Sequence, residues 1–191
     1  MDATKLTSFQ REFLWELNIP RVQLLALAEA IPEEAYGWRP AADARSFSEA
    51  LVHIGAGMMM LLFRAEVYSQ DVMEFCGSVE GEGIPMWLEM VHRSFAKEKS
   101  LTRKADVVDL LKKGFAAVEH AFTVTSENDL GARRDFGGEN TTTRRIYLRI
   151  LAHTHEHMGQ VVAYAREMGF RVPWPDPVKQ MEEMAAADAR R

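Results

Sequence analysis

The stretch "TRRIYLRILAHTHEHMGQVVAYAREMG", residues 143–169, decides how the rest of the chain is interpreted. Its apolar residues recur every three or four positions, which is the spacing of an amphipathic α-helix, and its last residue is a glycine, the usual residue just beyond a helix end. At about 100° per residue, six side chains fall within about 80° of arc on one face. Because the first part of this face is apolar, we expect it to point into a helical bundle. The six residues are Ile146, Ile150, His153, His157, Gln160 and Tyr164.

Two histidines lie together on this face. His153 and His157 differ by about 40° around the helix, whereas His155 lies about 200° from His153. Pairs at positions i and i+4 are a recurring metal-ligand spacing, as in the helix of zinc peptidases. That motif itself is absent, because Thr154 stands where it has a glutamate. The pair is therefore also compatible with two buried histidines that bond to water and neighbouring groups.

Three more long helices are predicted along the chain. The first runs from about Thr4 to Ala30, and Pro20 should kink or split it. The second begins after Ser46, because Glu49 follows at the spacing of a capping box, and it continues to about Tyr68. Another covers residues 105–125.

Connections between these helices are long. Residues 31–46, 76–85 and 131–143 are rich in glycine, proline and polar residues and are predicted to be loops. Residues 86–99 suggest a short helix. No run shows sustained alternation of apolar and polar residues, so no sheet is expected. The prediction is an all-α protein, a four-helix bundle with long loops and one or two short extra helices. The bundle should occupy residues 1–175, and residues 176–191 should form a C-terminal tail or short helix.

Composition limits the classes of function. A chain of 191 residues with 47% hydrophobic residues suits one globular domain. The net charge of −5 does not favour binding to nucleic acid. Cys76 is the single cysteine, so no disulfide can form within the chain.

Two features of the sequence argue against a location in a membrane. The first residues, "MDATKLTSFQRE", do not resemble a signal peptide. The longest apolar stretch, residues 50–63, is interrupted by His53 and is shorter than the ~20 residues of a membrane helix. We expect a cytoplasmic protein that binds neither membranes nor nucleic acid.

A third histidine strengthens the case for a metal. His53 lies in the middle of the second predicted helix, in the most apolar part of the chain. A lone histidine there is usually a satisfied core residue, but a bundle can bring it against His153 and His157 on a facing helix. Three neutral imidazoles leave coordination positions open for water or substrate. Gly57, one turn from His53, either leaves room beside such an ion or simply allows tight packing.

The chain resembles the DinB-like family of four-helix-bundle metalloproteins. "IPEEAYGWRPAADARSFSEALVHIGAGM", residues 31–58, is similar to the family's Trp-Arg-Pro loop and the helix that follows it with a ligand histidine. "FGGENTTTRRIYLRILAHTHEHMGQVVAYAREMG", residues 136–169, is similar to its last helix, with His-x-x-x-His and then Gly-Gln, although Met158 stands where an arginine is common. The resemblance implies metal ligands at His53, His153 and His157.

The resemblance also implies a divalent ion, often nickel or zinc, and for some relatives a thiol S-transferase or isomerase reaction with a small-molecule thiol cofactor. The first hypothesis is therefore a metal-dependent enzyme of the thiol transferase or hydrolase type. Gln160 and Tyr164 would line its pocket, and Glu49, one turn before His53, would orient that ring unless it serves only as a helix cap. Residues that act directly in catalysis cannot be assigned.

Two other hypotheses remain open. One is a non-catalytic protein that binds a metal or a small ligand at the same three histidines. The other is a structural dimer with a vestigial site. We expect a homodimer and a small-molecule substrate or thiol as the partners of the protein.

Overall fold

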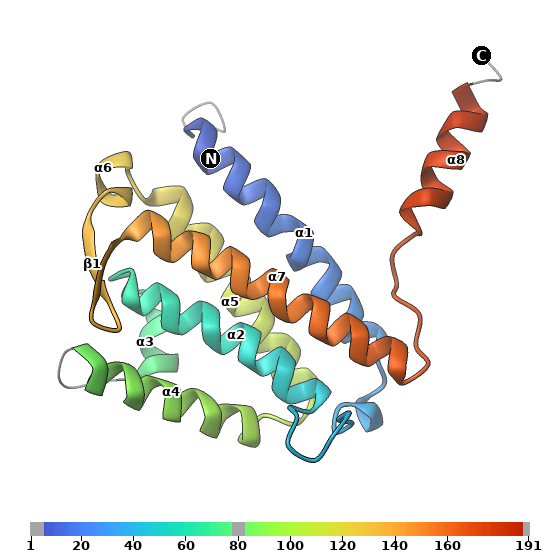
Figure 1. Ribbon diagram of the computed structural model, residues 1–191, viewed down its shortest axis with the longest axis horizontal. Helices are drawn as coiled ribbons and strands as arrows, with labels where there is room; N and C mark the ends of the chain where they lie inside the picture. The colour runs from blue at the N-terminus through green and yellow to red at the C-terminus, as the bar shows by residue number, and fades with distance from the viewer. Residues whose placement is uncertain (1–5, 78–82, 189–191) are drawn as a thin grey trace.

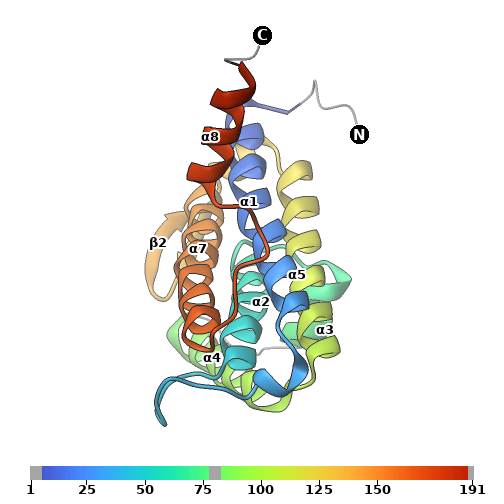
Figure 2. The same cartoon turned by 90° about the vertical axis from the view of Figure 1, so that its right-hand side faces the viewer.

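The computed structural model describes residues 6–77 and 83–188, and these residues form an α-helical bundle (Figure 1). Helix α2 lies against α5 and α7, and α1 packs on the other side of the same two helices. Figure 2 shows these four helices side by side. The predicted all-α four-helix bundle is confirmed. Its members are α1 (Ser8–Ala30), α2 (Phe47–Arg64), α5 (Lys104–Val124) and α7 (Thr143–Glu167).

Helix α2 is the innermost of the four. It is long and apolar enough to cross a membrane, but 83% of the apolar window is buried inside the bundle, as in the core helix of a globular domain. Two glycines let it approach α5 closely. A Cβ atom added to Gly55 would lie 2.8 Å from Cγ of Leu110, and one added to Gly114 would lie 3.5 Å from the carbonyl oxygen of Gly55.

The ends of α2 follow from local chemistry. Its first turn has the predicted capping box, in which Ser46 accepts a bond from the Glu49 backbone and Glu49 accepts one from the Ser46 backbone. The helix ends at Arg64 rather than near Tyr68, because Glu66 adopts a left-handed conformation with φ 62° that no α-helix can contain.

Helix α1 is continuous through its proline. Thr7 and Gln10 form a capping box, and the helix begins at Ser8; the predicted start at Thr4 lies outside the described residues. Pro20 is buried within the helix and does not divide it in two.

More short helices are present than the one or two predicted. Residues 76–85 were predicted to form a loop. The last three of them are helical, because α4 begins at Gly83 and extends over 18 residues. Residues 78–82 lie outside the described part. Helix α4 packs along α2 and so covers one side of the bundle near His53. The additional elements are a 3-10 helix, η2 (Glu33–Ala35), and α3 (Gln70–Cys76), α4 (Gly83–Ser100), α6 (Glu127–Leu130) and α8 (Pro177–Asp188).

The prediction that the chain contains no sheet was wrong. Strands β1 (Arg133–Phe136) and β2 (Glu139–Thr142) form an antiparallel hairpin in the segment predicted to be a loop. Gly137 and Gly138 connect them with φ of 65° and 89°, the conformation that a two-residue hairpin turn requires. Each strand has four residues, too few to show a sustained alternation. The hairpin contacts α2 through an ion pair between Arg64 and Asp135.

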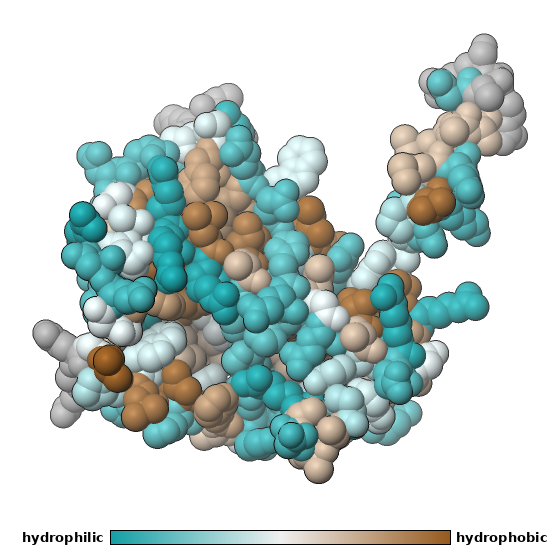
Figure 3. All heavy atoms as spheres, in the orientation of Figure 1, coloured by the Kyte–Doolittle hydropathy of each residue, from teal (hydrophilic) through white to brown (hydrophobic). Residues whose placement is uncertain are grey.

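Helix α8 is attached differently from the others. It projects from the bundle after the end of α7 (Figures 1 and 3), and none of its described residues is buried. Phe170 and Trp174, in the connection before it, pack against the core. The predicted boundary between a bundle of residues 1–175 and a tail of residues 176–191 stays a prediction, although α8 begins at Pro177.

Candidate metal centre

The three histidines selected from the sequence come together between α2 and α7. One ring nitrogen of each of His53, His153 and His157 lies within 4.8 Å of the others. The Nε2 atoms of His53 and His153 are 3.1 Å apart although the residues are separated by 100 positions in the chain. His155, on another face of α7, does not belong to this group.

A carboxylate from α4 orients the first histidine. Nδ1 of His53 lies 2.8 Å from Oε1 of Glu98, and the other oxygen of Glu98 accepts a bond of 2.7 Å from Arg45. Burial would raise the pKa of Glu98, but the hydrogen bonds from His53 and Arg45 outweigh it and hold that pKa below its usual value. Glu98 is therefore ionised and accepts the Nδ1 proton, which leaves the Nε2 lone pair of His53 free to bind an ion.

The orienting role considered for Glu49 belongs to Glu98 instead. Glu49 caps α2 and pairs with Arg39 and Lys99, at 3.0 Å and 2.9 Å. Sequence reasoning missed Glu98 because it lies 45 residues from His53 on a helix whose docking is not visible in the sequence. One signal was present, since Glu98 continues the helical stripe that contains Trp87 and Val91.

A second chain of hydrogen bonds orients His157. Its Nδ1 lies 2.9 Å from Oε1 of Gln160, and Nε2 of Gln160 donates to the hydroxyl of Tyr164 over 2.8 Å. The ring of Tyr164 in turn packs edge-on against Trp38, whose centroid is 5.5 Å away. Gln160 and Tyr164 thus act on the ring of His157, and they line a polar hollow beside Glu98 rather than the cavity at the histidines.

The third ring, His153, is held by close packing. A Cβ atom added to Gly57 would lie 2.4 Å from Cε1 of His153, so only glycine leaves room for this ring. Nδ1 of His153 is buried and forms no hydrogen bond among the described residues. Burial, more than the charges nearby, lowers the pKa of His153 to about 3. Burial also lowers the pKa of His157, and the hydrogen bond to Gln160 opposes this shift only in part.

A cavity of about 270 Å³ opens at the three histidines. Helices α2, α4 and α7 and strand β1 form its walls, and Gly57 lies in the wall beside His153. The apolar side chains that line it are Met60, Leu61, Trp87, Val91, Phe95 and Phe136.

The donor set suits a divalent metal ion. Two imidazoles bound to one ion at about 2.0–2.1 Å have nitrogens roughly 3.0–3.4 Å apart, and the observed 3.1 Å between His53 and His153 falls in this range. If both nitrogens present lone pairs, they repel each other unless a cation lies between them. Without an ion, His153 can instead donate its Nε2 proton to Nε2 of His53. The histidines would then form a buried cluster held by hydrogen bonds, which is the alternative to a metal site.

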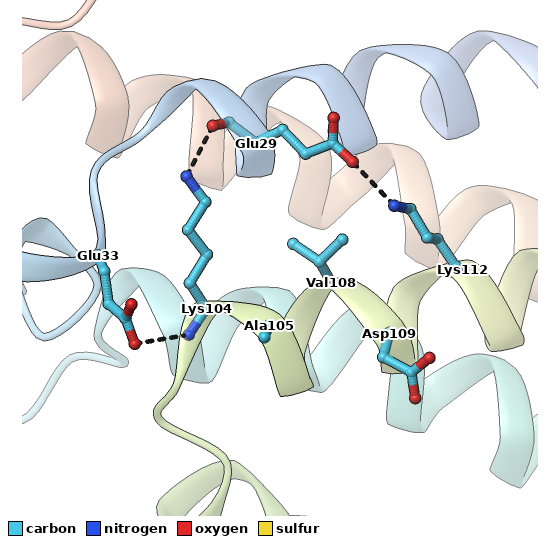
Figure 4. Close-up of a pocket in the computed structure, with 7 residues that line it drawn as sticks. All are labelled: Glu29, Glu33, Lys104, Ala105, Val108, Asp109 and Lys112. Carbon is cyan, nitrogen blue, oxygen red and sulfur yellow. Dashed lines mark hydrogen bonds and ion pairs between the residues drawn. The ribbon is translucent and has the colours of Figure 1, made fainter.

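Other candidate groups are less suitable. Burial raises the pKa of the Cys76 thiol to about 12, so this cysteine is a core residue and not a nucleophile. A hollow of about 500 Å³ between α1 and α5 contains charged residues that already bond to one another (Figure 4). Lys112 bonds to Glu29, and Lys104 bonds to the backbone of Glu29 and, through its own backbone, to Glu33.

Comparison with known proteins agrees with the fold and with the two sequence signatures. The model of the DinB superfamily matches residues 16–161, which include all three histidines. The chain belongs to the DinB superfamily. No curated protein matches the sequence.

Two solved structures of DinB-like proteins are similar to this DinB superfamily member. One, from Bacillus cereus ATCC 10987, has a TM-score of 0.64 at 17% identity, over 86% of this chain and 95% of that chain. Another, YjoA from Bacillus subtilis, has a TM-score of 0.54 at 20% identity, over 85% of this chain and 96% of that chain. At these identities the likeness concerns the fold alone.

Proposed function

We propose that this DinB superfamily member binds a divalent metal ion through His53, His153 and His157 and is a metal-dependent enzyme that transfers thiols. The observation that carries the proposal is the convergence of three imidazoles at the wall of a cavity, with the Nε2 atoms of His53 and His153 3.1 Å apart. Hydrogen bonds to Glu98 and Gln160 hold two of the rings with their Nε2 atoms free. Three protein ligands leave positions open for a substrate.

Nickel or zinc is the proposed ion, because imidazole nitrogen suits both. The lowered pKa values of His153 and His157 keep these rings neutral at physiological pH, which a ligand to any of these metals requires. Glu98 adds one negative charge behind His53, which Arg45 balances in part. The Glu98–His53 pair therefore fixes both the ring and its tautomer.

The walls of the cavity favour thiol transfer over hydrolysis. No carboxylate is among the described residues that line it, and half of its lining side chains are apolar. When bound, the ion would lower the pKa of a neighbouring thiol, whose ordinary value near 8.5 is far closer to neutrality than that of water, 15.7. In the transfer, the sulfur forms a bond to an electrophilic carbon and the bond from that carbon to its leaving group breaks, with both electrons going to the leaving group. The thiol proton ends on the leaving group or in solvent. Glu156, next to His157 in the sequence, is exposed and paired with Arg149.

Metal analysis of the purified protein tests the first half of the proposal. The wild type should contain one equivalent of ion, and His53→Ala, His153→Ala and His157→Ala should each lose most of it. His155→Ala is the matched control and should retain the metal. A strong chelator at pH 8 should lower the melting temperature, and nickel or zinc should restore it.

A direct assay tests the second half. The loaded protein should accelerate the loss of a small thiol in the presence of an electrophile such as an epoxide or an aryl halide, and the chelated protein should not. Bound metal without such turnover would favour a non-catalytic metal or small-ligand binding protein. Absence of metal, with melting insensitive to the chelator, would favour a vestigial site in a structural dimer.

We also propose that the protein is a cytoplasmic homodimer that binds neither nucleic acid nor membranes. Support for self-association comes from α1, where Trp15, Ile19 and Val22 are exposed at the spacing of a single helical face. Figure 3 shows hydrophobic residues on the surface over α1 and α7. Light scattering should give twice the mass of the chain, and Trp15→Glu should shift the protein towards the monomer.

A further inference from the structure

The cavity at the histidines is lined by both aromatic and aliphatic side chains. Trp87 and Phe95 come from α4 and Phe136 from β1, and the rings of Trp87 and Phe136 lie 5.5 Å apart. Met60 and Leu61 of α2 and Val91 of α4 also line it. Such walls bind the hydrocarbon part of a ligand, and a flat ring fits against aromatic side chains particularly well.

The lining of the cavity contains one charged side chain, that of Arg149, and no carboxylate among the described residues. Apart from the three histidines and Trp87, the residues with polar side chains that line it are Arg149 and Ser94. Arg149 lies one turn before His153 on α7, and its ion pair with Glu156 is exposed at both ends, with 39% and 57% of the side chains accessible. Water competes with such a pair, so Arg149 can exchange Glu156 for an anion in the cavity. The guanidinium of Arg64, 5.9 Å from the ring centroid of Trp87, is already paired with Asp135.

The size of the cavity limits the ligand. Its volume of about 270 Å³ is just below the ~300–1,000 Å³ of sites for drug-sized molecules. A molecule of about a dozen non-hydrogen atoms would fill it. A large hydrophilic thiol would leave most of its polar groups unpaired against these walls, which is unfavourable.

We infer that the histidine cavity selects a compact aromatic or branched apolar molecule that carries one anionic group, and that Arg149 binds this group. The inference deepens the proposed function by naming the substrate class. The inference rests on the proposed function for the identity of the reaction. The binding of the ligand does not rest on it, because the apolar walls and Arg149 are present without a bound ion. Arg149 is therefore the residue that determines specificity for charge, and the aromatic residues determine specificity for shape.

Calorimetric binding of matched probes tests the inference. The probes are 3-phenylpropionate, its uncharged amide 3-phenylpropionamide, and succinate as a hydrophilic anion. Each is titrated into metal-loaded and into chelated protein. The acid should bind at least tenfold more tightly than the amide in both forms, and succinate should bind far more weakly than the acid.

Three variants and one control variant separate the contributions. Arg149→Gln should weaken binding of the acid about tenfold and leave the amide unchanged. Glu156→Gln, which removes the ion pair but keeps the guanidinium, should leave binding of the acid intact or strengthen it. Arg166→Gln, an exposed arginine on the same helix, is the matched control and should change nothing. Val91→Phe should fill the cavity and abolish binding of both acid and amide while metal content stays normal.

Several outcomes would overturn the inference. Equal affinity for acid and amide, an equal loss of both in Arg149→Gln, or binding that survives Val91→Phe would each contradict it. A preference for the acid that disappears in chelated protein would assign anion recognition to the metal rather than to Arg149. Failure of the proposed function looks different: metal analysis would find no ion, while the Arg149-dependent preference for the acid would persist.

Discussion

At the scale of single residues, Gly57 shows how strictly the site is packed. The Cβ atom of alanine would overlap His153, so Gly57→Ala must displace that ring. Alanine ordinarily stabilises a helix by about 0.5–1 kcal/mol relative to glycine, but here we expect a loss of stability and at least a tenfold loss of metal affinity. Melting temperature and metal titration measure the two effects.

Gly159 is the matched control for this substitution. It lies within α7, whereas Gly57 lies within α2, and an added Cβ atom there would meet no heavy atom within 4 Å. Gly159→Ala should therefore raise the free energy of unfolding by about 0.5–1 kcal/mol without affecting the metal. If Gly57→Ala behaved in the same way, the packing described for His153 would be incorrect.

Substitutions of Glu98 and Glu49 should have different effects on metal affinity and on stability. Glu98→Gln keeps the shape of the side chain but loses the charge that fixes the tautomer of His53, so metal affinity should fall about 10–100-fold. Glu49→Gln weakens the pairs with Arg39 and Lys99 and should lower stability while metal affinity stays near wild type. Equilibrium competition with a metal indicator distinguishes them, and a larger metal defect in Glu49→Gln would contradict the assignment.

His153 also makes the metal-free protein sensitive to acid. Its pKa is lowered to about 3 in the folded state, against about 6.5 when unfolded. Below pH 6.5 the unfolded chain therefore binds a proton that the folded chain does not, and stability should fall by at most ~1.4 kcal/mol per pH unit as the pH decreases from about 6.5 towards 3. Urea unfolding of chelated protein from pH 8 to pH 5 measures this slope. His153→Gln, which cannot titrate, should have a shallower one.

At the scale of helices and strands, the hairpin turn depends on left-handed glycine. Gly138 has φ 89°, so Gly138→Ala should lower the free energy of unfolding by about 1 kcal/mol or more. Gly37, where an added Cβ atom would meet nothing and no positive φ occurs, is the control and should tolerate alanine. Chemical denaturation of both variants is the measurement, and equal stabilities would contradict the role of the turn.

Helical spacing was enough to predict the four long helices, because an apolar stripe is a local property of sequence. The same spacing selected His153 and His157, and the apolar surroundings of His53 together with the family resemblance added the third histidine; the structure brings the three within 4.8 Å. The hairpin was missed because four-residue strands contain too few alternations, although Gly137-Gly138 matched a known turn type. Glu98 was missed for a different reason: which carboxylate meets His53 depends on how α4 docks against α2, and docking depends on the whole core.

At the scale of the whole molecule, the bundle should fold without its last helix. Helix α8 buries none of its described residues, so removing residues 177–191 should leave both melting temperature and metal content within error of wild type. Removal from residue 170 onward would also delete Phe170 and Trp174, which pack on the core, and should lower the melting temperature. A marked loss of stability in the shorter truncation would mean that α8 contributes contacts in solution.

The span of 100 residues between His53 and His153 has a consequence for how the protein unfolds. An ion bound to both rings would crosslink the second and the last helix of the bundle and close a loop that contains about half of the chain. A disulfide across a loop of this length lowers the conformational entropy of the unfolded chain by up to ~4–5 kcal/mol in free energy. By analogy, the ion should have the same effect on any unfolded state in which both histidines remain bound to it. The loaded protein should accordingly unfold far more slowly than the chelated one, and hydrogen exchange of the α2 and α7 amides should slow together. The ion would then determine the lifetime of the folded chain as well as its chemistry.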